Sequence, residues 1–173
     1  MRERELNEPP RRSDSRPAES PEGQQARLLQ RWADGRATLK DVRGYSDEEL
    51  YSIAKTAYFF YYQGRLQEAR TLFQGLYAVN PVDPYFAKAL GVVELAAGNS
   101  QGALSAYDVA IKLDPADPGA YVGRAEVRIA QGNRAQALED LRKAMQAASA
   151  DPRILGKARA LFEALARSGR DRP

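Results

Sequence analysis

The chain has 173 residues, of which 43% are hydrophobic and 28% charged, with a formal net charge of +3. This length suits one compact domain with terminal extensions. The absence of cysteine and histidine excludes disulfides, typical zinc sites and the Ser-His and Cys-His pairs of common hydrolases. We therefore expect no metal, no other cofactor and no enzymatic activity.

Residues 1–23 are expected to form a disordered tail. They hold four of the ten prolines, six acidic residues and five arginines, and almost nothing that could be buried. Such a segment cannot offset the entropy lost on ordering. Neither this tail nor any other stretch has the apolar run of a signal peptide or a membrane span, which predicts a cytoplasmic protein without membrane insertion.

Residues 24–45 are expected to form an N-terminal helical segment. Leu28, Leu29 and Trp32 recur at helical spacing, and Gly35 interrupts the pattern. Basic residues in this segment and after residue 118 are too dispersed to indicate nucleic acid binding.

A strong helix start follows at Ser46-Asp47-Glu48-Glu49. This is a capping box, in which the hydroxyl of Ser46 accepts from the amide of Glu49 and the carboxylate of Glu49 reaches back. A long helix is therefore predicted from about Asp47 to Gly64.

The rest of the chain repeats with a period of 34 residues. The columns that share this step are Gly64, Gly98 and Gly132; Ala69, Ala103 and Ala137; Phe73, Tyr107 and Leu141; and Pro81 and Pro115. This is the tetratricopeptide pattern, with small residues at helix contacts, an aromatic residue four positions later and a closing proline. The sequence thus predicts an all-α tetratricopeptide-repeat solenoid of helix-turn-helix units.

The predicted domain covers residues 46–167. Three repeats span residues 50–83, 84–117 and 118–150, and a capping helix spans residues 151–167. The apolar stripe of that last helix begins at Ile154 and ends at Leu165, as a helix with one wet face requires. Residues 168–173 are expected to fray.

The repeat register assigns side chains to two surfaces. An inward position of the first helix places Phe60 in the core. Phe73 and Tyr107, on the second helices of their repeats, are expected in the core as well. The remaining positions line a concave groove that is apolar with phenolic rims, which suits an extended apolar peptide. The candidate peptide-binding residues are Tyr51, Lys55, Tyr58, Tyr61, Tyr62, Tyr85, Lys88, Val92, Leu95, Val122, Glu126 and Ile129.

Five consecutive rings, Tyr58 to Tyr62, cannot all lie on one buried stripe of a helix. Two interpretations of Tyr58, Tyr61 and Tyr62 stay open: contact with a bound peptide, or packing against a neighbouring helix. Phe59 should face the N-terminal helix, which is expected to cover it.

The stretch RGYSDEELYSIAKTAYFFYYQGRLQEARTLFQGLYAVNPVDPYFAKALG, with the later repeats and the closing helix, resembles the class II chaperones of type III secretion over roughly residues 40–166. In that family such a domain holds two hydrophobic translocator proteins in the bacterial cytoplasm before export. The resemblance implies the same function and partners here, with the segment gripped by Tyr51, Tyr58, Tyr61, Tyr62, Tyr85, Val92 and Leu95. It also implies self-association as a homodimer through the N-terminal part, with Leu28, Leu29, Trp32 and Phe59 as candidates.

Other functions are weighed on the same residues. A clamp for a terminal carboxylate needs basic or amide groups at the fifth and ninth repeat positions, and only Lys88 fits. A phosphate-binding glycine loop is missing, which favours passive holding over ATP-driven refolding. A tetratricopeptide scaffold in another bacterial assembly or regulatory complex remains the alternative.

Overall fold

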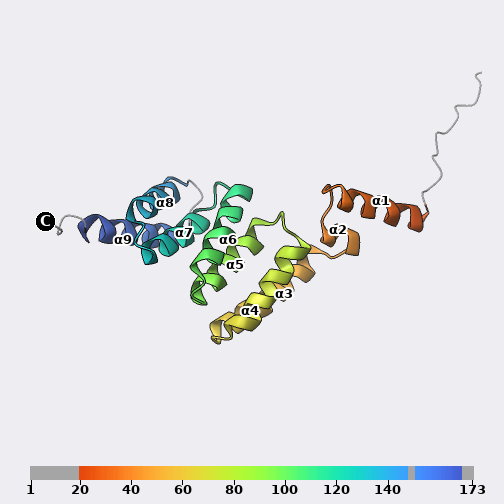
Figure 1. Cartoon of the computed structure of the whole chain (residues 1–173), viewed down its shortest axis with the longest axis horizontal. Coiled ribbons are helices and arrows are strands. Elements are labelled where there is room, and N and C mark those ends of the chain that lie inside the picture. Colours follow the sequence, from red (N-terminus) through yellow and green to blue (C-terminus); the bar gives the residue numbers. More distant parts are fainter. Residues whose placement is uncertain (1–19, 148–150, 169–173) are drawn as a thin grey trace, which may run out of the picture.

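The computed structural model describes residues 20–147 and 151–168, and these residues form helices without any strand. Figure 1 shows the helices in a row along the long axis, each beside its neighbours in sequence, as the 34-residue period predicts. Within the described residues, none of the helices is long and apolar enough to cross a membrane. The helices are α1 (Pro21–Ala33), α2 (Leu39–Arg43), α3 (Asp47–Tyr62), α4 (Leu66–Val79), α5 (Pro84–Ala96), α6 (Ser100–Leu113), α7 (Pro118–Ala130), α8 (Arg134–Gln146) and α9 (Pro152–Ser168).

The first helix begins inside the predicted tail. The hydroxyl of Ser20 accepts from the amide of Gly23 at 3.2 Å, and Pro21 and Glu22 occupy the first turn. The predicted tail boundary at residue 23 is therefore too late, because Ser20 caps the helix and Pro21 is favoured in its first turn. The remainder of the predicted tail, residues 1–19, lies outside the described residues, as do residues 169–173 at the other end.

The three predicted helical pairs are confirmed as α3 with α4, α5 with α6, and α7 with α8. The capping box at Ser46 forms as expected, with the Glu49 amide donating to the Ser46 hydroxyl at 3.2 Å. Each pair turns at Gly64, Gly98 or Gly132, whose φ angles lie between 74° and 76°. This left-handed conformation is strained for other residues, which explains why glycine recurs at the step of 34.

The core follows the repeated columns with one exception. Ala69, Ala103 and Ala137 are fully buried between the paired helices, and Phe73 and Tyr107 are buried as predicted. Phe60, however, is only half-buried, and the guanidinium of Arg65 lies 4.2 Å above its ring. The prediction that Phe60 is core is wrong, because no preceding repeat covers that side of α3.

The ring of Tyr107 lies between two glycines on the neighbouring first helices. A Cβ atom on Gly123 of α7 would stand 2.5 Å from Cε1 and 2.6 Å from the hydroxyl of Tyr107, and one on Gly91 of α5 would stand 2.9 Å from Cε1. Real Cβ atoms do not approach so closely, so both glycines are required by the ring of α6.

Gly123→Ala is therefore expected to lower the free energy of unfolding by about 1–3 kcal/mol through overpacking. Urea denaturation measures this change. Gly156→Ala in α9 is the control, because nothing lies within 4 Å of a Cβ there, and it should be neutral or stabilising by up to about 1 kcal/mol. Equal stability of both variants would show that Tyr107 can move aside.

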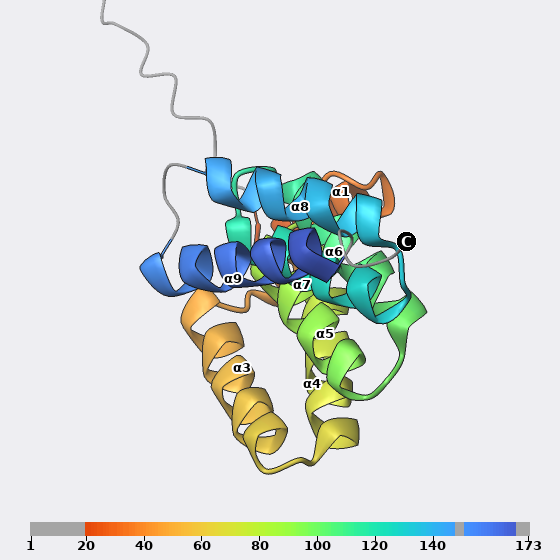
Figure 2. The same cartoon turned by 90° about the vertical axis from the view of Figure 1, so that its left-hand side faces the viewer.

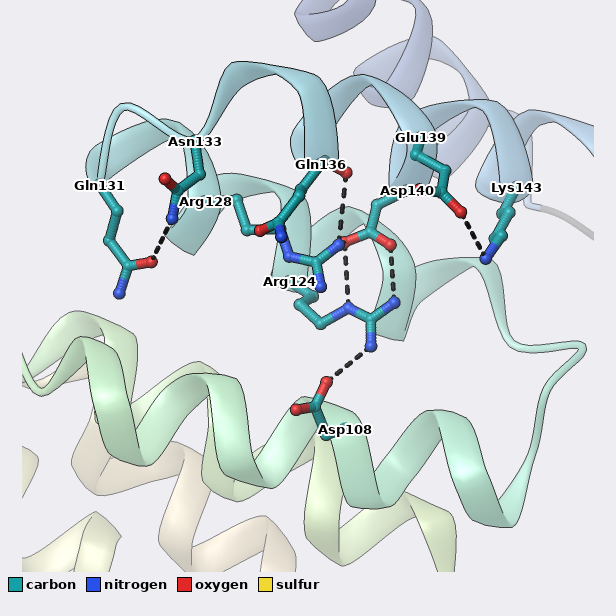
Figure 3. A network of polar contacts seen from close by, with 9 residues as sticks. All are labelled: Asp108, Arg124, Arg128, Gln131, Asn133, Gln136, Glu139, Asp140 and Lys143. Carbon is teal, nitrogen blue, oxygen red and sulfur yellow. Dashed lines mark hydrogen bonds and ion pairs between the residues drawn. The ribbon is translucent and has the colours of Figure 1, made fainter.

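A buried polar network ties the third repeat together (Figure 3). Asp140 of α8 is 1% exposed and accepts two bonds from Arg124 of α7, at 3.0 and 2.7 Å, and one from Arg128 at 2.7 Å. Arg124 also donates to Asp108 of α6 at 2.6 Å. Burial works against the charge of Arg124, but its bonds to Asp140 and Asp108 raise its pKa above the ordinary value. The network therefore fastens α6, α7 and α8 to one another.

The last helix closes the solenoid as predicted. Figure 2 shows α9 lying along α7 and α8, and it contacts both. Ala158 is fully buried, with Leu161, Phe162 and Leu165 packed around the same cluster. The helix ends at Ser168, one residue beyond the predicted boundary.

Candidate peptide-binding groove

Five tyrosines of α3 and α5 form one continuous aromatic surface, which we call the tyrosine surface. The ring of Tyr62 lies 5.3 Å from that of Tyr61 and 6.3 Å from that of Tyr58. Tyr58 in turn lies 6.4 Å from Tyr85 of the next repeat, and Tyr85 lies 5.3 Å from Tyr51. The aromatic rings of the two helices are thus in contact with one another along this surface.

Tyr58, Tyr61 and Tyr62 differ in how far they are buried. Tyr58 is half-buried and packs edge-on against Phe73 at 5.0 Å, and burial raises its pKa, helped by the neighbouring Tyr85. Tyr62 is 80% exposed, and Tyr61, like Tyr58, is half-buried. Tyr58 therefore fills space between the helices, whereas Tyr62 presents its ring to solvent.

Two polar members of the candidate set are engaged within the fold. The hydroxyl of Tyr51 donates to Asp83 at 2.8 Å, and this bond, with burial and the nearby carboxylate, raises the pKa of Tyr51 to about 12. The ammonium of Lys88 pairs with Asp117 at 2.5 Å. Asp83 and Asp117 also cap α5 and α7, so these bonds join successive repeats. Lys55, by contrast, is exposed on α3.

The third repeat does not supply the open groove that the register predicts. Val122 is 4% exposed, and Ile129 is half-buried in a cluster that includes residues of α9. Glu126 pairs with Lys157 of α9 at 2.7 Å. Val122 is therefore not open to a peptide, and Glu126 and Ile129 are engaged by α9, which packs along α7 as the first helix of a fourth repeat would.

Tyr107 lies in the core, beneath the helices that carry the groove candidates. Burial raises the pKa of Tyr107, and the nearby carboxylate of Glu126 adds to this effect. The ring reaches from α6 to Gly91 of α5 and Gly123 of α7. Val92 and Leu95 of α5 are half-buried beside the same cluster. Gly91 and Gly123 are the sequence signal that could have revealed this arrangement.

Comparison with known proteins gives the family. A profile described as "Tetratricopeptide repeat" matches residues 54–120 and 93–152, which is more than half of the chain. The chain belongs to the tetratricopeptide repeat family.

Relatives of this tetratricopeptide chain include named chaperones. "Chaperone protein SicA" of Salmonella typhimurium is 38% identical over 77 residues, which are 44% of this chain and 47% of SicA. The chain thus matches about half the length of these curated relatives.

Solved structures share the tetratricopeptide fold. The type III secretion translocator chaperone SycD of Yersinia enterocolitica superposes with a TM-score of 0.70 at 23% identity, covering 74% of this chain and 98% of SycD. PcrH in complex with the chaperone binding region of PopD gives a TM-score of 0.67 at 23% identity, covering 73% of this chain and 97% of PcrH. At this identity the likeness shows the fold.

The N-terminal helix of the tetratricopeptide chain does not cover Phe59. Phe59 is 58% exposed, and α1 packs on α2 rather than on α3 (Figure 1). Asp34 and Arg36 pair in the turn after α1, and Lys40 of α2 pairs with Asp47 of α3. The predicted cover is wrong, because α1 packs on α2 and leaves its Leu29 and Trp32 exposed.

Proposed function

We propose that this protein is a cytoplasmic chaperone of type III secretion that holds hydrophobic translocator proteins before export. It would do so by binding an extended apolar segment of the client in the groove of the first two repeats. Covering that segment lowers the concentration of the aggregation-prone form by mass action.

The observation that carries this proposal is the exposed end of the tyrosine surface. Tyr62 is 80% exposed at the end of α3, beside Tyr61. Val92 and Leu95 are half-buried on α5, the first helix of the next repeat. Tyrosines supply large contact area at low entropic cost and hydroxyls for a peptide backbone. The class of client is inferred from SycD, which is named a type III secretion translocator chaperone, and from PcrH, which is seen with the chaperone binding region of PopD.

We infer that the groove is confined to the first two repeats, where Lys55 is exposed; the other charged candidates are paired within the chain. Lys88 is held by Asp117 and Glu126 by Lys157. A client segment therefore gains little from acidic or basic side chains here, and we expect apolar residues to dominate its recognition.

Co-production with the products of neighbouring genes tests the proposal. If a hydrophobic secreted protein is encoded nearby, it should co-purify with this chain and remain soluble in its presence. Co-purification instead with components of a pilus or of a regulatory complex would favour the scaffold function. Failure to retain any such protein would contradict the proposed holding activity.

We also propose that the protein self-associates through Leu28, Leu29, Trp32 and Phe59. Trp32 is 50% exposed on α1, and exposed apolar residues on one helix indicate a docking surface.

Replacing Leu29 and Trp32 together by alanine should shift the protein from dimer to monomer in analytical ultracentrifugation. The melting temperature should change by no more than about 2 °C, since α1 packs only on α2. A dimer that survives both substitutions would place the interface elsewhere.

A further inference from the structure

A second apolar groove lies at the N-terminal end of the solenoid, on the side of α3 and α4 that faces away from α5. It consists of two adjoining hollows of about 240 and 360 Å³ that share Thr71 and Leu72. Ile53 and Gly75 line the first hollow and Phe60 lines the second. We call this surface the end groove.

The internal repeat shows what such a groove accommodates. The residues 34 positions after Ile53, Phe60 and Thr71 are Ala87, Glu94 and Ser105, and they line the corresponding hollow of the second repeat. There a helix of the preceding repeat, α4, supplies Tyr77 to the hollow and Arg70 to Glu94, at 2.7 Å. Each internal groove is therefore closed by a helix.

In the third repeat, too, a helix of the preceding repeat contacts the corresponding surface, here through polar residues. Asp108 of α6 pairs with Arg124 at 2.6 Å, where α6 meets α7 and α8. Phe59 gives a parallel comparison, since its counterparts Val93 and Val127 are fully buried whereas Phe59 is 58% exposed. Within the described residues, the first repeat alone has no preceding repeat to supply such a helix.

Gly75 gives an independent indication that something docks here. A Cβ atom on Gly75 would meet nothing within 4 Å, so packing within the chain does not require a glycine. Glycine in the middle of a helix is destabilising relative to alanine, and it permits close approach of another backbone. The corresponding residues of the later repeats are Val109 and Lys143.

The chain's own N-terminal helix does not fill the end groove. Trp32 of α1 lines a different hollow with Pro81 and Val82, just beyond the end of α4. Phe60 in the end groove is the immediate neighbour of Tyr61 on the tyrosine surface. A client chain that leaves the peptide groove at the end of α3 can therefore reach the end groove directly.

We propose that the end groove binds an amphipathic helix of the client protein, in addition to the extended segment bound by the tyrosine surface. This inference rests on the proposed function. The helix would present an aromatic or aliphatic side chain where Tyr77 stands in the second repeat. It would need no basic partner, because Phe60 replaces the carboxylate of Glu94.

Photocrosslinking from two positions tests this inference. Benzoylphenylalanine replaces Thr71 in the end groove or Tyr62 on the tyrosine surface, and each full-length variant is co-produced with the secreted proteins of neighbouring genes. Both positions should crosslink the same client, at different segments identified by mass spectrometry, and the segment captured from Thr71 should have an apolar face at helical spacing.

Gly75→Leu should fill the end groove and reduce the crosslinking from Thr71 by about tenfold, as loss of a central contact does. Gly156→Leu is the matched control, since it also adds a side chain at an open helical glycine, and it should leave the yield unchanged. A crosslink from Tyr62 without one from Thr71, or a Thr71 product with a second copy or with α1, overturns the inference and leaves the proposed function standing. Capture from neither position contradicts both.

Discussion

Asp140→Ala is expected to lower the free energy of unfolding by about 3–5 kcal/mol, the usual cost of breaking a buried ion pair on one side. The carboxylate accepts three charge-assisted bonds and is 1% exposed, so its removal leaves Arg124 and Arg128 partly buried without this partner. Urea denaturation followed by circular dichroism measures the effect. The midpoint should fall while the groove of the first two repeats keeps its geometry.

Asp108→Ala is the matched control for this substitution. It removes a carboxylate from the same guanidinium, but the side chain of Asp108 is 59% exposed, so its loss should cost no more than about 1 kcal/mol. Equal effects of the two substitutions would show that water replaces the Asp140 carboxylate and that the network does not fasten α7 to α8.

Replacing Tyr61 and Tyr62 together by alanine should weaken client binding by about 2–4 kcal/mol, the range of interface hot spots. The free energy of unfolding should fall by only about 1 kcal/mol, because Tyr62 is exposed and Tyr61 half-buried. Isothermal titration with the co-purified client segment and urea denaturation of the same samples give the two quantities.

Tyr58→Ala provides the contrasting variant. Its ring packs on Phe73 and fills the space between α3 and α5, so the fold should lose about 2–3 kcal/mol. If the double substitution at Tyr61 and Tyr62 unfolds the chain yet spares binding, the tyrosine surface is a packing feature and the proposed groove is wrong.

The sequence predicts the parts of this fold that depend on local geometry. Glycines with positive φ, such as Gly98, and the capping box at Ser46 are set by the backbone of a few residues, and they form where the sequence predicts them. The register leaves open whether Tyr62 packs against a helix, and its exposure is seen only in the structure.

Two predictions that the structure contradicts concern contacts between a repeat and a helix that lies outside the repeats. Val122 is buried and Glu126 is paired with Lys157 where α9 packs on α7, and the docking of α9 is not part of the period. Phe59 is exposed because α1 packs on α2 rather than on α3. Such contacts join side chains far apart in the sequence, so the pattern within one segment does not predict them.

The two ends of the solenoid differ in how many neighbours they pack against, and this difference affects how a bound client would be released. The C-terminal end is closed by α9 and fastened through Asp140, whereas α3 and α4 have one side without a neighbouring repeat. In a linear array, each repeat is stabilised by its neighbours, so amide hydrogens of the first repeat should exchange fastest and a bound client should slow them most. Release of a client bound at this end would then require the first repeat alone to open, and the rest of the chain would remain as a template on which it refolds.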